Sequence, residues 1–268
     1  MIFLRKVYIL NLSYLKGELR KEKRLDLLRK KKKNNNSVSL EELKEKFEIS
    51  MNTVRRDIEL LVKEGIIKKV YGGVVLTEAV KPLRAYEKRK NFNIKIKELI
   101  GKRASEYIED NDTIFIDSGT TTLQIIPFLK DKKNLTVISH SLPVIDALYK
   151  LENIKVIVLP GILLRETASF VGNISSEFLK PFNIKKAFMG CNGITEIRQI
   201  TNATFEEYEV KKNIINKSEM VILLADKEKF GNGGIMTFAE VTDIDILITD
   251  SGVEEKYLNL FSNKIDIL

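Results

Sequence analysis

Six short apolar runs, alternating with segments of helical spacing, constrain the fold of residues 93–268 more than any other feature of the chain. The runs are TIFID, LTVIS, IKVIVLP, KKAFMG, MVILLAD and IDILITD, at 113–117, 135–139, 154–160, 185–190, 220–226 and 244–250. Helical patterns lie near 93–108, 122–130, 142–151, 175–182 and 205–218. Buried strands that alternate with amphipathic helices predict an α/β domain with a mostly parallel sheet.

Composition excludes several other classes of protein. With 268 residues, 44% of them hydrophobic, the chain can bury a sizeable core, and it contains no run of about 18 apolar residues that would cross a bilayer. One cysteine and one histidine exclude an intrachain disulfide and leave too few ligands for a Cys/His metal site. We therefore expect a cytoplasmic protein that has no metal or cofactor and no contact with a membrane.

Positive charge is concentrated in the first third of the chain. Residues 1–90 carry 24 Lys and Arg against 12 Asp and Glu, whereas the remaining residues carry 21 against 25. A general bias toward lysine would raise the charge everywhere, so this asymmetry indicates a small module that binds a polyanion and a larger module with another task.

Capping residues, apolar spacing and glycines predict helices and a hairpin in the basic N-terminal third of the chain. Residues 18–33 have the leucine spacing of a helix, and Ser39 with Glu42 forms a capping box that starts a second helix at 40–47. Ser50 can cap a third helix, with Val54, Ile58, Leu61 and Val62 facing inward. Gly65 would end this helix, and IIKKV, YGG and VVL then predict a hairpin.

These elements predict a small N-terminal winged helix-turn-helix domain over residues 18–76. Residues 1–17 are expected to form an N-terminal extension, because Asn11 and Ser13 interrupt their apolar run and no cleavage site for a secretory signal follows. Residues 77–92 would be a linker, and residues 93–268 the α/β domain.

The third helix and the hairpin carry the candidate DNA-binding residues. A helix in the major groove needs long hydrogen-bond donors and short polar groups, and the hairpin can reach the backbone or the adjacent groove. A solvated surface is the alternative for each residue alone, but the caps, the wing and the charge favour DNA. The candidates are Asn52, Thr53, Arg55, Arg56, Lys68, Lys69 and Tyr71.

DSGTTT at 117–122 is the strongest candidate ligand site. It leaves a strand through a glycine turn and enters a helix, so backbone N–H groups, hydroxyls and a helix N-terminus converge, as in a phosphate cradle. It matches neither the Walker A nor the GxGxxG pattern, so a nucleotide is not implied. A helix cap that binds no ligand is the alternative.

Other polar groups follow the remaining strands. GCNG at 190–193 offers a second turn of N–H groups, and Lys211 and Lys229 could meet a phosphate or lie at the surface. Cys191 is expected to be a neutral wall residue, since no base accompanies it. His140, without an identifiable partner, is expected to be structural or exposed to solvent rather than catalytic.

Two sets of motifs resemble the DeoR family of bacterial transcriptional regulators. SVSLEELKEKFEISMNTVRRDIELLVKEGIIKKVYGGVVL at 37–76 is similar to the family's DNA-binding signature. TIFIDSGTTTLQI, LTVISHSLPVIDAL, AFMGCNGI, EVKKNII, LLADKEKFG and DILITD resemble successive blocks of its sensor domain. The match covers about residues 18–253 in the family's order.

The resemblance implies a repressor whose C-terminal domain is similar to ribose-5-phosphate isomerase and senses a phosphorylated sugar. By position, the effector site would contain Asp117, Ser118, Gly119, Thr120, Thr121, Thr122, Gly190, Asn192, Gly193, Lys211 and Lys229. The expected partners are an operator in double-stranded DNA, the sugar phosphate, and further copies of the chain in a dimer or larger oligomer.

Two other functions remain open at this point. The α/β domain could be a sugar-phosphate isomerase that uses acids such as Asp117 or Asp226, although the basic module at the N-terminus argues against an enzyme. Alternatively, the chain could bind DNA while its C-terminal domain serves only for oligomerisation.

Overall fold

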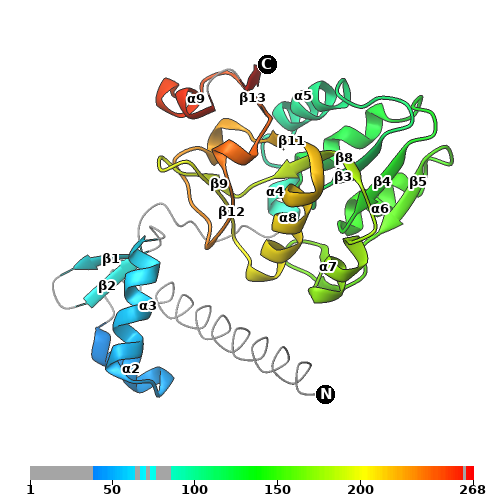
Figure 1. The fold of residues 1–268 in the computed structure, drawn as a ribbon. Coiled ribbons are helices and arrows are strands. Elements are labelled where there is room, and N and C mark those ends of the chain that lie inside the picture. Colours follow the sequence, from blue (N-terminus) through cyan, green and yellow to red (C-terminus); the bar gives the residue numbers. More distant parts are fainter. Residues whose placement is uncertain (1–38, 64–66, 71–72, 77–85, 262–263) are drawn as a thin grey trace, which may run out of the picture. The chain divides into compact units, whose positions relative to one another are not determined.

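The computed structural model describes residues 39–63, 67–70, 73–76, 86–261 and 264–268 (Figure 1). It divides into two compact units, Met1–Pro82 and Leu83–Leu268. The extension at 1–17, the helix predicted at 18–33 and Tyr71 lie outside the described residues.

Two helices and a β-hairpin make up the described part of the first unit. Helix α2 spans Leu40–Phe47, helix α3 spans Met51–Lys63, and strands β1 (Ile67–Val70) and β2 (Gly73–Leu76) pair antiparallel. The predicted helix starts are confirmed by their caps. Ser39 Oγ accepts a hydrogen bond from the N–H of Glu42 at 3.0 Å, and Ser50 Oγ accepts one from the N–H of Thr53 at 3.2 Å.

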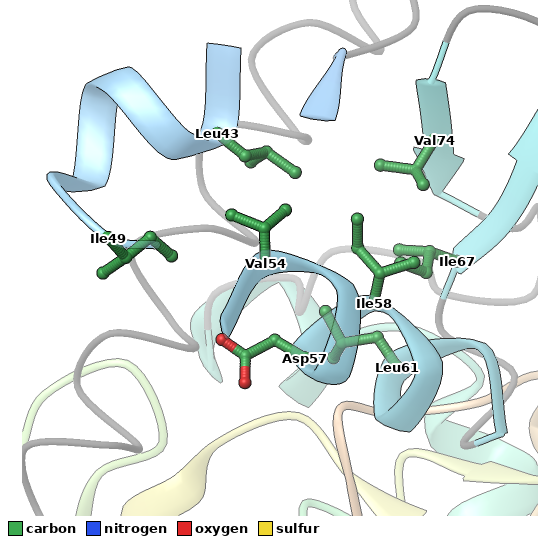
Figure 2. Close-up of a pocket in the computed structure, with 8 residues that line it drawn as sticks. All are labelled: Leu43, Ile49, Val54, Asp57, Ile58, Leu61, Ile67 and Val74. Carbon is green, nitrogen blue, oxygen red and sulfur yellow. The ribbon is translucent and has the colours of Figure 1, made fainter. Parts of the chain in front are cut away.

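The apolar face of α3 packs between α2 and the hairpin. Figure 2 shows side chains from these elements converging, and the buried ones are Leu43, Val54, Ile58, Leu61, Ile67 and Val74. Val62, which was also predicted to face inward, is 36% exposed. One residue beyond Leu61 lies about 100° further around the helix, which takes Val62 off the buried stripe.

Seven strands of the described chain form one parallel sheet in the second unit, which confirms the predicted α/β class. Their order is β14-β13-β11-β8-β3-β4-β5, and every neighbouring pair is parallel. In chain order they are β3 (Thr113–Ile116), β4 (Thr136–Ser139), β5 (Lys155–Val158), β8 (Ile184–Gly190), β11 (Ser218–Leu224), β13 (Ile246–Thr249) and β14 (Ile265–Ile267).

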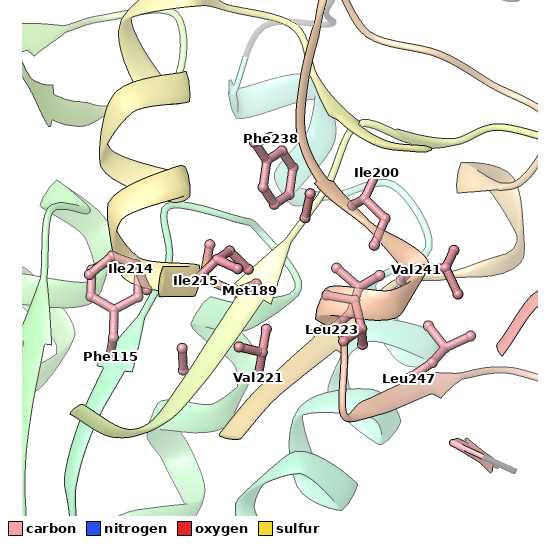
Figure 3. Close-up of a cluster of buried hydrophobic side chains, with 14 of the residues drawn as sticks. Phe115, Met189, Ile200, Ile214, Ile215, Val221, Leu223, Phe238, Val241 and Leu247 are labelled. Carbon is pink, nitrogen blue, oxygen red and sulfur yellow. The ribbon is translucent and has the colours of Figure 1, made fainter. Parts of the chain in front are cut away.

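Helices cover both faces of this sheet. Along each strand, successive residues enter opposite hydrophobic clusters, as for Phe115 and Ile116 of β3. One cluster contains residues of α7 (Asn173–Leu179), α8 (Phe205–Lys217) and α9 (Glu255–Phe261), and Figure 3 shows part of it. The other contains residues of α5 (Ile94–Ser105), η1 (Thr122–Phe128) and α6 (Leu142–Leu148).

One predicted helix has a different form. The segment expected to be helical at 122–130 is the short 3₁₀ helix η1. Pro127 lies inside it and has no backbone N–H to donate, which disfavours a continuous α-helix.

Several small elements lie within segments for which the sequence predicts no strand or helix. Strands β6 (Ile162–Leu164) and β7 (Ser169–Val171) form a hairpin, and β12-β10-β9 form a three-stranded sheet. The members of that sheet are β9 (Gly193–Ile194), β10 (Gln199–Asn202) and β12 (Met236–Glu240). The other elements that were not predicted are α4 (Tyr86–Lys90), the 3₁₀ helices η2 (Lys227–Lys229) and η3 (Val241–Asp243), and the C-terminal elements α9 and β14.

The strand order reverses direction at the middle of the large sheet. From β3 the chain moves outward through β4 to β5, then returns to β8 on the other side of β3 and moves outward again through β11 and β13. Ligands of open α/β sheets bind at such a reversal, outside the carboxyl ends of the strands. Asp117 follows β3 at this point, and Gly190 ends β8.

Candidate functional site

A small polar pocket lies at the carboxyl ends of β3 and β8. Its lining comes from four parts of the second unit, namely α4, the turn after β3, the end of β8 with the turn that follows, and α8. The residues are Arg89, Asp117, Ser118, Gly119, Gly190, Cys191, Asn192, Glu207 and Lys211. Six of the predicted effector residues are among them.

Asp117 is the centre of this site and is completely buried. Its Oδ1 lies 3.0 Å from His140 Nε2, and its Oδ2 accepts a hydrogen bond from the N–H of Gly190 at 2.9 Å. Lys211 Nζ contacts the same Oδ2 and donates to the carbonyl of Gly190 at 3.0 Å. Burial alone would raise the pKa of the Asp117 carboxyl, but Lys211 and His140 outweigh it and hold that pKa well below its usual range.

Glu207 is a buried carboxylate of the site that was not predicted. Its Oε1 accepts hydrogen bonds from the hydroxyls of Ser118 at 2.6 Å and Ser169 at 3.0 Å, and its Oε2 accepts one from Thr204 at 3.0 Å. Glu207 precedes Lys211 by four residues on α8, so the two side chains share one helix face. That spacing is visible in the sequence and could have identified Glu207 once Lys211 had been chosen.

Arg89 enters the pocket from the segment predicted to be a linker. It lies on α4 and is half-buried. Burial lowers the pKa of its guanidinium, while the negative charges of Glu207 and Asp117 oppose this shift. Lys97 of α5 donates to the carbonyl of Arg89 at 2.5 Å and so attaches the end of α4 to the body of the unit. No local pattern in this charge-rich stretch marked Arg89.

The three threonines of the DSGTTT turn lie outside the pocket lining, and Thr122 stabilises the turn. Thr120, Thr121 and Thr122 are buried, and Thr122 Oγ1 donates to the carbonyls of Asp117 and Gly119, both at 2.8 Å. Gly119 and Gly190 approach closely, since a Cβ on Gly190 would lie 3.5 Å from the Cα of Gly119.

Of the other predicted effector residues, Asn192 lines the pocket, whereas Gly193 and Lys229 do not. Asn192 lines the pocket and accepts a hydrogen bond from the N–H of Ala203 at 2.8 Å. Gly193 lies outside the lining and allows a close backbone contact, because a Cβ there would be 2.1 Å from the carbonyl oxygen of Asn232. Lys229, which is half-buried on η2, is also outside the lining.

Cys191 is half-buried in the wall of the pocket, and His140 is completely buried. Burial raises the pKa of the Cys191 thiol to about 12, against the influence of Lys229 and Lys211, which fits the neutral wall residue expected from the sequence. His140 is completely buried and has two hydrogen-bond partners, Asp117 and the carbonyl of Phe170.

Four of the predicted DNA-binding residues are exposed on the described part of the first unit. Asn52, Arg55 and Arg56 of α3 are exposed, and Thr53 is half-buried with its hydroxyl 2.9 Å from that of Ser50. Lys68 belongs to β1, and the neighbouring Lys69 is exposed. Arg55 and Lys69 line one hollow between α3 and the hairpin.

The described residues contain neither a metal-binding cluster nor a membrane-spanning helix. No group of His, Cys, Asp and Glu side chains in the described ranges could hold a metal ion. No described helix has the length and apolar character needed to cross a membrane.

Family models match both units of the chain. The model of the DeoR C terminal sensor domain matches residues 92–251, and that of the DeoR-like helix-turn-helix domain matches residues 20–80.

The chain is similar to known transcriptional regulators, and each match covers most of the regulator's length. The HTH-type transcriptional regulator IolR of Bacillus subtilis (strain 168) is 42% identical over 221 residues, which cover 82% of this chain and 88% of that protein. The lactose phosphotransferase system repressor of Lactococcus lactis subsp. lactis is 33% identical over 93% of this chain and 97% of its own. The glycerol-3-phosphate regulon repressor of Escherichia coli (strain K12) is 28% identical over 80% of this chain and 84% of its own.

Among solved structures, a D-ribose-5-phosphate isomerase in complex with phospho-erythronic acid aligns with a TM-score of 0.39 and 17% identity, over 51% of this chain and 54% of that chain. The relatives with clear sequence identity are regulators and not enzymes, so the isomerase alternative is not supported.

One family model matches the helix-turn-helix region of the chain, and another matches most of its second unit. The chain therefore belongs to the DeoR family of transcriptional regulators.

Proposed function

We propose that this chain represses genes of sugar metabolism and is controlled by a phosphorylated sugar that binds at the pocket around Asp117. The observation that carries the proposal is the pocket's set of charged groups, which are buried or half-buried. Asp117 and Glu207 supply carboxylate oxygens, while Lys211 and Arg89 supply an ammonium and a guanidinium. Carboxylates accept hydrogen bonds from sugar hydroxyls, and the cations suit a phosphate.

The names of the relatives support a phosphorylated ligand and support repression rather than activation. Two of them are named as repressors, one of a lactose phosphotransferase system and one of a glycerol-3-phosphate regulon. Both names refer to the metabolism of sugars or of a phosphorylated three-carbon compound.

DNA would be bound by the first unit. Arg55 and Arg56 are exposed on α3 and would contact bases or phosphates in the major groove, with Asn52, Thr53 and the hairpin residues Lys68, Lys69 and Tyr71 positioning the module. A helix-turn-helix protein binds symmetric half-sites as a dimer or larger oligomer, and we place this one in the cytoplasm with the DNA.

Helix α4 offers a route from the ligand to the DNA-binding unit. It contributes Arg89 to the pocket and follows the segment 77–85, which connects the two units in the chain. A ligand that draws Arg89 toward Asp117 and Glu207 would shift α4. The resulting change in DNA affinity cannot exceed the ligand's preference for one arrangement over the other.

Fluorescence anisotropy of the full chain on DNA from upstream of its own gene tests this function. We expect salt-sensitive binding that resists competitor DNA and that one member of a panel of sugar phosphates releases. The corresponding unphosphorylated sugar is the matched control and should have no effect. Binding that every compound leaves unchanged would contradict control by a sugar phosphate, and absence of specific binding on all operators tested would contradict the regulator.

A further inference from the structure

The side chain of His140 lies in an environment that a neutral imidazole cannot satisfy. The residue follows β4, its ring is completely buried, and it packs against Phe115 with 5.7 Å between the ring centroids. Nε2 lies 3.0 Å from Asp117 Oδ1, and Nδ1 lies 3.1 Å from the carbonyl oxygen of Phe170.

Both of these oxygens can only accept. A backbone carbonyl has no proton to donate. The Asp117 carboxyl is ionised, because its other oxygen receives the N–H of Gly190 and contacts the Lys211 ammonium. A neutral imidazole carries one N–H, so either tautomer would leave a nitrogen lone pair facing an oxygen lone pair at about 3 Å in a buried place. Both contacts are satisfied only when both ring nitrogens carry a proton.

The charges around His140 determine how a second proton on its ring would change the net charge of the pocket. Asp117 after β3 touches the ring, and beyond it stand Lys211 and Glu207 of α8 and Arg89 of α4. The negative charges of the two carboxylates and the positive charges of the two cations cancel, so these four residues together have no net charge. We propose that His140 is held as an imidazolium that positions Asp117 and gives the pocket the net positive charge that an anionic ligand pairs with. The second half of this inference rests on the proposed function, whereas the first half does not.

The same ring ties the β6–β7 hairpin to the pocket. Phe170 of β7 accepts from His140 Nδ1 through its carbonyl and donates its own N–H to the carbonyl of His140 at 2.7 Å. The neighbouring Ser169 donates to Glu207. A ligand that displaces Asp117 or Glu207 would therefore move β7 through two adjacent hydrogen bonds.

The protonation of His140 can be measured directly, because the chain contains one histidine. We would record long-range ¹H–¹⁵N spectra of the full-length, tag-free, ¹⁵N-labelled protein between pH 6 and 9. An ordinary histidine has a pKa of about 6.5 and would be neutral at pH 7.5. The proposal predicts two protonated ring nitrogens at pH 7.5, each bonded to a slowly exchanging proton. One unprotonated nitrogen at that pH would overturn it.

A second experiment separates the charge from the structural contact. Inorganic phosphate would be titrated into the wild type and into the variants His140→Asn and His140→Gln, whose amides can donate to Asp117 without a positive charge. We expect phosphate affinity to fall about tenfold in both variants, as for the loss of one charge near a buried anion, while circular dichroism confirms that they are folded.

The outcomes of the two experiments are distinguishable. Equal phosphate affinity in wild type and folded variants would overturn the role of the charge. If the wild type binds no phosphate, the anionic ligand of the proposed function is contradicted, and the ring spectrum alone then decides the protonation of His140. If both variants unfold, the same spectrum decides.

Discussion

Replacing Lys211 by Met should destabilise the second unit severely while keeping nearly the same side-chain volume. Lys211 is 4% exposed and Asp117 is completely buried, so the change removes the ammonium and leaves a buried carboxylate with less compensation. The hydrogen bond to the carbonyl of Gly190 is lost as well. Removing one partner of a buried ion pair costs about 3–5 kcal/mol.

Urea denaturation followed by circular dichroism measures this change in the free energy of unfolding. At roughly 2–4 °C per kcal/mol for a chain of this size, the melting temperature should fall by about 10 °C. Lys212→Met is the matched control, because Lys212 is adjacent and exposed and should change stability by about 0.5 kcal/mol or less. The double variant Asp117→Asn/Lys211→Met should recover part of the loss, since it no longer buries a charge.

The effect of pH on the same variant has a definite sign. In the wild type the pKa of Asp117 is lowered, so its ionised form contributes stability that is complete above the unfolded value of about 3.9 and is lost as the pH falls through the folded value. Without Lys211 the pKa of Asp117 rises, because the largest influence that lowers it is gone, so the variant can relieve its buried charge by taking up a proton. The stability difference should therefore be largest near neutral pH and shrink on acidification. A neutral-pH difference below 1 kcal/mol, or one that grows in acid, would refute this account of the site.

Three further changes test other parts of the structure. Arg55→Ala or Arg56→Ala should weaken operator binding by about 1–3 kcal/mol in anisotropy titrations, and unchanged affinity in both would reject α3 as the reading helix. Gly193→Ala should lower the urea midpoint of unfolding clearly, because the added Cβ would lie 2.1 Å from the carbonyl oxygen of Asn232. Gly233→Ala is the control and should leave the midpoint unchanged, because its Cβ would lie 3.5 Å from the nearest atom. Equal midpoints in the two variants would contradict the close contact at Gly193. Cys191 should react slowly with a thiol reagent at pH 8, because burial raises its pKa to about 12, and rapidly in urea; a fast reaction in the folded protein would show that the thiol is accessible.

Local pattern was enough to predict six of the seven described strands of the large sheet and the two described helices of the first unit, but it did not predict β14. Five of the six predicted strands are short runs that end in a polar residue or a glycine, and the run at 154–160 ends in Pro160; burial on both faces of a parallel sheet favours such apolar runs. Capping residues gave the starts of α2 and α3 for the same reason, since a cap acts within three residues. Strands β9 and β7 are only two and three residues long, too short for any period to be recognised.

The candidate site was predictable only in part. Asp117 and Lys211 stand at a strand end and on an amphipathic helix, where their chemistry is visible locally. The partners of His140 come from the turn after β3 and from β7, 23 and 30 residues away in the chain, so no local spacing reveals them. Arg89 reaches the pocket through the packing of α4, which is a tertiary property.

The separation of Asp117 from Lys211 also bears on how the protein is made. The two residues are 94 positions apart, so on the ribosome the carboxylate emerges long before the ammonium that compensates its burial. At about 5–20 residues per second this interval lasts roughly 5–20 s. During this interval the first unit, whose described elements end at Leu76, has already been synthesised. A nascent chain can therefore complete the sequence of its first unit well before it forms the ion pair at the centre of the candidate site.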